Sequence, residues 1–102
     1  MVLDAVELAR KALGDRYRVK VTCAHLKIQH DADLDRFAKL GVFANYTPWW
    51  HCEHIEEMIP LFGEKRSENM YRCKTVWDSG AVVTWSSDNV VFGDFVPWNP
   101  YL

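Results

Sequence analysis

The first thirteen residues carry an apolar pattern that is typical of an amphipathic helix. Between residues 2 and 13, apolar side chains recur at intervals of three and four, at Val2, Ala5, Val6, Ala9, Ala12 and Leu13. This spacing places them on one face of a helix, and Gly14 is suited to end that helix. The pattern therefore predicts a first helix over residues 2–13.

Three short segments instead have the composition of β-strands. Residues 19–25 alternate and are rich in β-branched side chains, so they predict a strand that ends near His25. Residues 42–47 predict a second strand, and the apolar run 81–85 predicts a third strand that is buried. Two serines and the carboxylate Asp88 follow the third strand. The chain thus places a histidine and an aspartate at the C-terminal ends of two predicted strands.

Helical patterns separate these strands. Residues 31–33 offer N-cap candidates for a short helix whose apolar face is formed by residues 34–38. Three further helical segments precede the third strand: residues 55–62, in which Pro60 ends or kinks the helix, residues 64–71 and residues 73–79. Strands that alternate with helices predict an α/β fold of parallel βαβ units with about three strands.

The composition excludes several classes of protein. The chain has 102 residues, of which 49% are hydrophobic and 25% charged, and its formal net charge is −2. These values are typical of one domain with a packed core, and no basic run indicates a nucleic-acid surface. No apolar stretch reaches the length of a membrane span, and the three cysteines form no CxxC pair. We therefore expect a cytoplasmic protein with reduced thiols that binds neither nucleic acid nor a membrane.

His25 and Asp88 are the principal candidates for a functional site. Each lies at the end of a predicted strand. In a parallel sheet both side chains emerge at the same edge, where metals and substrates are commonly bound. A single histidine or aspartate at a strand end more often bonds to a loop backbone, so the spacing leaves both interpretations open.

A second candidate is the aromatic loop after the second predicted strand. Trp49 and Trp50 directly follow that strand and are candidates to line a substrate pocket, together with His51. His51 and His54 also have an H-x-x-H spacing, which can place both imidazoles on one face of a helix. A structural zinc site normally needs four ligands, and the sequence offers no second pair. The alternative is an exposed helix start beside a loop.

Three stretches of the chain together resemble the amidohydrolase 3 group of the metal-dependent hydrolase superfamily. Residues 24–50, AHLKIQHDADLDRFAKLGVFANYTPWW, resemble the family segment E-H-x-Q-x-x-x-x-D-x-x-R-F-x-x-L-G-V-x-A-x-x-x-P. Residues 70–91, MYRCKTVWDSGAVVTWSSDNVV, are similar to a short helix, D-x-G-A, a strand and [GS]-S-D, and Asn99-Pro100 resembles a later N-P. Ala24 and Lys27 stand where the family usually has glutamate and glutamine.

The resemblance implies a fold and a reaction. The fold would be part of a TIM-like (β/α)8 barrel whose strand ends hold a divalent metal, with zinc as the expected ion. His25 corresponds to a metal ligand that ends strand six. Asp88 corresponds to the aspartate of strand eight, which binds metal and takes a proton from the attacking water. The substrate would be a small molecule with an amide-type, non-peptide C–N bond.

The resemblance also implies that residues 1–102 are a single fragment of a larger barrel domain. The family's H-x-H motif on strand one, its bridging residue on strand four and its histidine on strand five have no counterpart in the sequence. Two candidate ligands remain, whereas a catalytic zinc normally takes three from the protein. We therefore expect the 102-residue chain alone to bind metal weakly or not at all and not to hydrolyse amides.

Two other classes of function remain open. A non-catalytic assembly module would use the edges of an unclosed sheet and core residues such as Val21, Val83 and Trp85 to pair with another chain. We accordingly expect self-association through open sheet edges. A small zinc module built on His51–His54 is the third interpretation.

Overall fold

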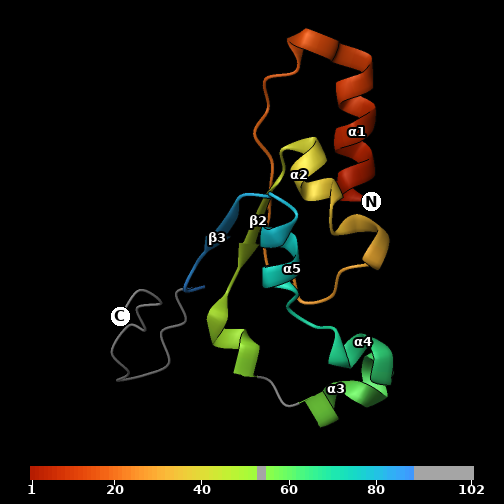
Figure 1. Cartoon of the computed structure of the whole chain (residues 1–102), viewed down its shortest axis with the longest axis vertical. Helices are drawn as coiled ribbons and strands as arrows, with labels where there is room; N and C mark the ends of the chain where they lie inside the picture. The colour runs from red at the N-terminus through yellow and green to blue at the C-terminus, as the bar shows by residue number, and fades with distance from the viewer. Residues whose placement is uncertain (53–54, 89–102) are drawn as a thin grey trace.

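A computed structural model describes residues 1–52 and 55–88 of the chain, and helices alternate with strands along these ranges (Figure 1). The helices are α1 (Val2–Leu13), α2 (Arg36–Leu40), α3 (Ile55–Phe62), α4 (Glu64–Glu68) and α5 (Cys73–Asp78). The strands are β1 (Thr22–Cys23), β2 (Phe43–Tyr46) and β3 (Val83–Trp85). Short 3-10 turns lie at Gly14–Arg16, Asp31–Asp33 and Pro48–Cys52.

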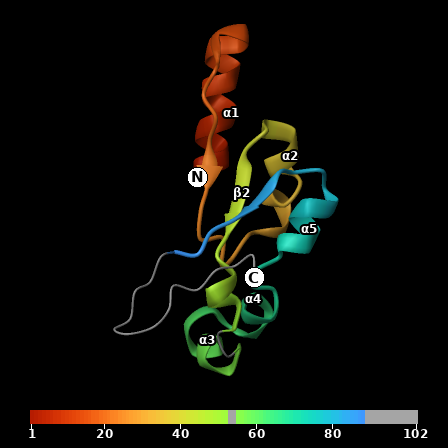
Figure 2. The same cartoon turned by 90° about the vertical axis from the view of Figure 1, so that its left-hand side faces the viewer.

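The three strands form one parallel sheet with β2 at its centre. Thr22 of β1 lies opposite Phe43, and Val83 of β3 lies opposite Ala44. Helices α2 and α5 lie along one face of the sheet, whereas α3 and α4 lie beyond the C-terminal end of β2 (Figure 2). The parallel α/β architecture predicted from the alternation of helical and strand patterns is therefore present.

The hydrophobic core lies between the sheet and the helices on that face. Side chains along a strand alternate between its two faces, so Ala44 and Tyr46 point to the same side of β2, and both are 0% exposed. Asn45 points to the opposite face, which we call the open face and define by Asn45 and its partner in register, Thr84. The core residues are Leu3, Val6, Leu34, Phe37, Val42, Ala44, Tyr46, Val76, Ala81 and Val83.

The first strand is shorter than the sequence predicts. Residues 19–25 have the alternation of a strand, yet β1 covers only Thr22–Cys23. The Phe43 amide still donates to the Val21 carbonyl at 2.9 Å, just before β1. His25 has a left-handed backbone with φ 55°, which an extended strand does not permit. The predicted span of residues 19–25 is therefore too long, although the strand does end near His25.

The third strand is less buried than the sequence predicts. Val82 is 53% exposed and Trp85 is 38% exposed, whereas Val83 is buried. Helices α2 and α5 cover one face of the sheet, and Val82 lies on the other. Trp85 lies on the covered face but at the end of the strand, so the apolar run does not become a fully buried strand. Val83 is consequently a core residue and not one of the open positions predicted for self-association.

Helix α1 forms as predicted, but much of its apolar face remains exposed. Its buried residues are Leu3 and Val6. Polar contacts join the helix to α2, because Arg36 Nη2 lies 2.8 Å from Asp4 and 3.0 Å from Glu7. These carboxylates and Asp33, at 2.6 Å from Nη1, raise the pKa of Arg36, with Asp33 the largest contributor. The helix is therefore held by an ion-pair cluster as well as by apolar packing.

Helix ends depart from the predictions in small ways. The side chain that caps the Asp31–Asp33 turn belongs to His30, whose Nδ1 accepts from the Ala32 amide at 3.2 Å. Gly41 ends α2 in the left-handed conformation with φ 57°, as its position suggests. Pro60 does not end α3, which continues to Phe62. Helix α4 ends earlier than the pattern of residues 64–71 predicts.

Candidate functional site

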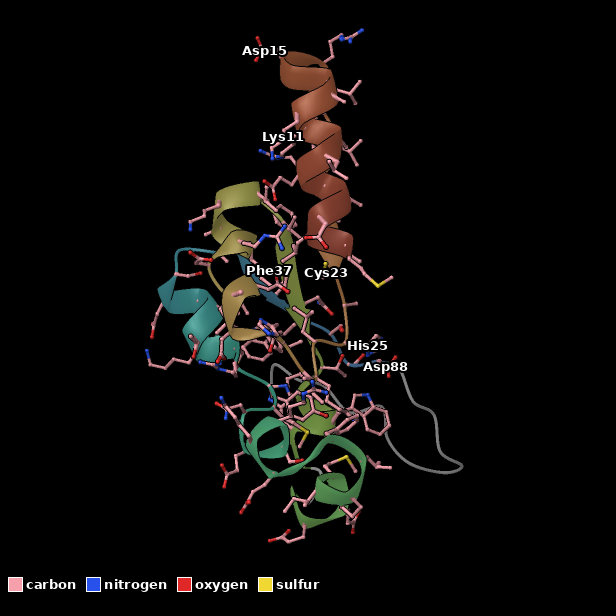
Figure 3. All side chains as sticks on the ribbon, turned by 90° about the vertical axis from the view of Figure 1, so that its right-hand side faces the viewer. Lys11, Asp15, Cys23, His25, Phe37 and Asp88 are labelled. Carbon is pink, nitrogen blue, oxygen red and sulfur yellow. The ribbon has the colours of Figure 1, made fainter. Side chains whose placement is uncertain are left out.

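The side chains of His25 and Asp88 meet at the C-terminal end of the sheet (Figure 3). His25 follows β1 and Asp88 follows β3, the two strands that flank β2. His25 Nε2 lies 3.8 Å from Asp88 Oδ1, and both side chains are partly exposed. Their proximity agrees with the argument that residues after parallel strands gather at one edge of the sheet.

Trp50 completes this group from the segment after β2. It lies in the Pro48–Cys52 turn, and its Nε1 donates a hydrogen bond to Asp88 Oδ2 at 2.9 Å. The two carboxylate oxygens therefore face different partners, Oδ1 the imidazole of His25 and Oδ2 the indole of Trp50. Each of the three parallel strands thus contributes one residue to the site from the segment that follows it.

A pocket of about 380 Å3 surrounds these three side chains. Its lining combines ionisable, hydroxyl and aromatic groups with one aliphatic side chain. The lining residues are His25, Leu26, Lys27, Thr47, Trp50, Tyr71 and Asp88. A concave site with a few convergent polar groups is typical of a small-molecule pocket.

Three residues of this pocket have an unusual backbone conformation. His25, Tyr71 and Asp88 have φ values of 55°, 52° and 58°, and they are the non-glycine residues with positive φ in the described ranges. Such conformations cost about 1–3 kcal/mol each and concentrate at functional sites, where surrounding contacts hold them in place. Here the Lys27 amide donates to the His25 carbonyl, and the Tyr71 amide donates to the Lys27 carbonyl, both at 2.8 Å.

A row of polar side chains on the open face of the sheet leads into the pocket. Asn45 Nδ2 donates to Thr84 Oγ1 at 3.0 Å, and Ser86 Oγ donates to Asn45 Oδ1 at 2.9 Å. Ser86 Oγ also lies 3.3 Å from Thr47 Oγ1, and Thr47 lines the pocket although it is 2% exposed. The network fixes the Thr47 hydroxyl at the pocket wall, because a buried hydroxyl requires hydrogen-bond partners.

His51 lies in an aromatic cluster beside the pocket and is not among the lining residues. Its ring centroid is 4.3 Å from that of Tyr71 and about 6 Å from those of Tyr46 and Trp85. Burial lowers the pKa of His51, and its Nε2 is buried without a hydrogen-bond partner in the described residues. Burial therefore favours the neutral form of the His51 imidazole, which is packed against these three rings. The alternative of an exposed helix start over residues 51–54 includes residues outside the described ranges.

Burial also acts on a tyrosine of this cluster. It raises the pKa of Tyr46 to about 12, and Gln29 Nε2 donates to the Tyr46 hydroxyl.

The side chain of Trp49 and the whole of His54 lie outside the described part of the chain. Their predicted parts in substrate binding and in an H-x-x-H zinc site thus stay predictions.

A comparison with protein families identifies the chain. The sequence model of the amidohydrolase family matches residues 1–101. The chain is a member of the amidohydrolase family. Comparisons with curated proteins and with solved structures found no match. The family match spans all three stretches whose motifs resemble this family, and it includes His25 and Asp88.

The family implies a divalent metal, and the described side chains can be compared with the ligands that such an ion needs. Among residues 1–52 and 55–88, no three His, Cys, Asp or Glu side chains converge on one point. His25 and Asp88 form a pair, and ligands of a tetrahedral zinc lie about 3.4 Å apart. The observed 3.8 Å between Nε2 and Oδ1 is close to that separation.

Residues 1–52 and 55–88 contain no helix with the length and apolarity needed to cross a bilayer.

Sequence reasoning missed several members of the site. Lys27 departs from the family pattern, and no sequence motif predicts that Lys27, Thr47 or Tyr71 lines the pocket. Tyr71 precedes α5 and reaches the site through the left-handed turn at its own position, which no motif signals. For Trp50 the aromatic loop was a signal, but it predicted contact with substrate and not a bond to Asp88.

Proposed function

We propose that this chain supplies one wall of a metal-dependent amidohydrolase site that cleaves the C–N bond of a small amide-type substrate with an activated water. The observation that carries the proposal is the approach of His25 to Asp88 at the C-terminal end of a parallel sheet. Family membership supports it, because the motifs of that family lead to these two positions.

The pair suits a divalent cation in the chemistry of its donors. A histidine nitrogen and a carboxylate oxygen are common zinc ligands, and Trp50 donates a hydrogen bond to the carboxylate oxygen Oδ2 of Asp88. When bound, a divalent cation lowers the pKa of a nucleophilic water and polarises the scissile carbonyl. His25 and Asp88 are the residues of this chain that would hold the ion.

The remaining residues have roles that follow from their places in the pocket. An oxygen of Asp88 would accept the proton of the attacking water and return it to the leaving nitrogen, the work of a general base and acid. Trp50 and Tyr71 would exclude water around the substrate, and the Thr47 hydroxyl is held where it can hydrogen-bond a polar group. Their substrate contacts are part of the proposal.

We further propose that the sheet is part of a TIM-like barrel. In such barrels the inner face of the sheet is packed by side chains from all strands, and the site lies at the strand C-termini. The open face carries the polar row of Asn45, Thr84 and Ser86, which ends in the pocket. Two ligands are fewer than the three that a catalytic zinc takes, so further strands would complete both the barrel and the metal site.

Binding of Mn2+ to the 102-residue chain tests the ligand pair. Carboxylate and imidazole ligands suit this ion better than thiolates do, so the cysteines interfere little. Paramagnetic broadening in amide NMR spectra should be centred on His25 and Asp88 and be lost in His25→Ala and Asp88→Ala. His30→Asn, which changes an exposed histidine outside this pocket, should leave the broadening unchanged. Broadening centred elsewhere would refute the pair.

A turnover assay tests the proposed incompleteness of the site. The isolated chain, mixed with zinc and simple amides, should hydrolyse them no faster than free zinc does. Hydrolysis well above that level, lost in Asp88→Ala, would show that this chain is sufficient for catalysis and would contradict the proposal of a partial site.

A second candidate, an assembly module, is favoured by exposed apolar side chains. Val82 is 53% exposed on the open face of β3, and Trp77 is 62% exposed on α5. Among the described residues, β3 pairs with a strand on one side only, and large exposed apolar side chains beside such an edge favour self-association. Light scattering at high protein concentration should then give a dimer that Val82→Lys dissociates. A monomer at all concentrations would exclude this candidate.

A further inference from the structure

Trp50 hydrogen-bonds to Asp88, a residue 38 positions later in the chain. Its indole nitrogen donates to Asp88 Oδ2 at 2.9 Å, whereas Asp88 Oδ1 lies 3.8 Å from His25 Nε2. A tryptophan nitrogen can only donate, and a carboxylate can only accept, so this bond has one possible sense. The oxygen that faces away from His25 is the one that the indole holds.

We propose that Trp50 is a positioning residue, which fixes the Asp88 carboxylate so that a single oxygen, Oδ1, is presented to a cation on the His25 side. This inference rests on the proposed function of the His25–Asp88 pair. Trp50 itself has no part in bond cleavage.

The backbone around the two residues supports this role. Asp88 has φ 58°, a left-handed conformation that is strained for a residue with a side chain, so contacts around it are needed to hold it in place. Trp50 is itself held by the bond from its amide to the Thr47 carbonyl at 3.1 Å. Thr47 is in turn fixed by the polar row of the open face. A chain of bonds thus runs from the sheet to the Asp88 carboxylate.

The chemistry of metal sites gives the expected size of the effect. Hydrogen bonds to the ligands of a metal orient them, and loss of such a partner typically costs about 10–100-fold in metal affinity. Trp50→Phe retains an aromatic ring and removes the N–H donor, together with the five-membered half of the indole. The variant should therefore keep the fold, judged by an unchanged melting temperature, and weaken Mn2+ binding by about tenfold or more.

Indole NMR resonances provide a readout that needs no metal. The chain has five tryptophans, and Trp50→Phe identifies the Trp50 Nε1–H signal by its disappearance. Asp88→Ala should move that signal upfield, because it removes the acceptor. Asp78→Ala, at a carboxylate paired with Lys74, should leave the signal in place. Trp77→Phe, at an exposed tryptophan, serves as the control for the Mn2+ titration.

The outcomes separate this inference from the proposed function. Equal Mn2+ affinities for wild type and Trp50→Phe, with binding still lost in His25→Ala, would overturn the positioning role and leave the ligand pair intact. An indole signal unchanged in Asp88→Ala would overturn it as well. If the indole signal moves but His25→Ala and wild type bind Mn2+ equally, Trp50 positions Asp88 and the proposed metal pair is wrong.

Discussion

His25 and Asp88 approach each other across the central strand, although the strands that precede them do not pair. Neighbouring strands lie about 4.8 Å apart, so β1 and β3 are separated by roughly twice that distance. Both residues have a left-handed backbone, and their side chains close to 3.8 Å between Nε2 and Oδ1. The two turns after the strands, more than the strands themselves, therefore create the contact.

The packing around β2 predicts which substitutions unfold the domain. Phe37 is 3% exposed and belongs to the core, so Phe37→Ala should lower the free energy of unfolding by about 3–5 kcal/mol. Leu61 is 69% exposed, so Leu61→Ala should change the free energy of unfolding by less than about 0.5 kcal/mol. Urea denaturation monitored by circular dichroism measures both values. Equal effects would contradict the assigned core.

Gly41 is required by the turn between α2 and β2. Its φ is 57°, and an added Cβ would lie 3.3 Å from Arg10 Nη2. Gly41→Ala should therefore destabilise the fold by about 1 kcal/mol, because alanine is strained in the left-handed region. Gly41→Asn should cost less, since asparagine tolerates that conformation. Thermal unfolding of the two variants gives the comparison, and a more stable alanine variant would exclude the left-handed turn.

The ion-pair cluster at Arg36 predicts part of the response to acid. The N-terminal ammonium and Arg36 lower the pKa of Asp4, and Lys11 and Arg36 lower that of Glu7. These groups stabilise the fold above their ordinary pKa values of 3.8 and 4.5, and the contribution is lost as the pH falls below them. Arg36→Gln should thus lower the melting temperature at neutral pH. The drop in melting temperature between neutral and acid pH should then be smaller in the variant than in the wild type.

The control for that variant is Lys74→Gln, which removes an exposed pair with Asp78 on α5. It should leave the loss of stability in acid unchanged. The effect of Arg36→Gln should also shrink at high salt, since the pairs are partly exposed. An acid response identical in Arg36→Gln and wild type would show that the cluster does not couple α1 to α2.

His51 predicts a separate response at higher pH. Burial lowers its pKa below the ordinary value of 6.5, so the unfolded chain binds a proton that the folded chain does not. Stability should therefore fall as the pH drops below about 6.5. His51→Phe retains a packed ring without a titrating group and should flatten this part of the profile. His30→Asn should leave this part of the profile unchanged. Urea midpoints measured across this pH range for both variants and the wild type test the prediction.

The sequence predicted the elements that local patterns determine. Helices α1 and α5 and strand β2 lie where periodicity and turn residues place them. The extent of burial was harder to predict, because it depends on which faces other elements cover. Val82 and Trp85 have the composition of a core strand, yet both are exposed.

The candidate site shows the same division between local and tertiary information. The order of parallel strands is enough to predict that His25 and Asp88 lie at one edge of the sheet. The bond from Trp50 to Asp88 depends on the conformation of the turn after β2 and on the left-handed backbone at Asp88. No residue pattern predicts either conformation. The sequence therefore indicates the aromatic loop as a candidate but does not indicate that Trp50 binds Asp88.

The most direct test of the account is a crystal structure of the chain soaked with zinc, with diffraction data recorded at the zinc absorption edge. Because the pair supplies two ligands, the chain is expected to bind zinc weakly, so the soak uses a zinc concentration high enough to fill a weak site. An anomalous peak is then expected within about 2.0–2.2 Å of both His25 Nε2 and an oxygen of Asp88. Zinc bound at His51 or at a cysteine, with no peak between His25 and Asp88, would contradict it.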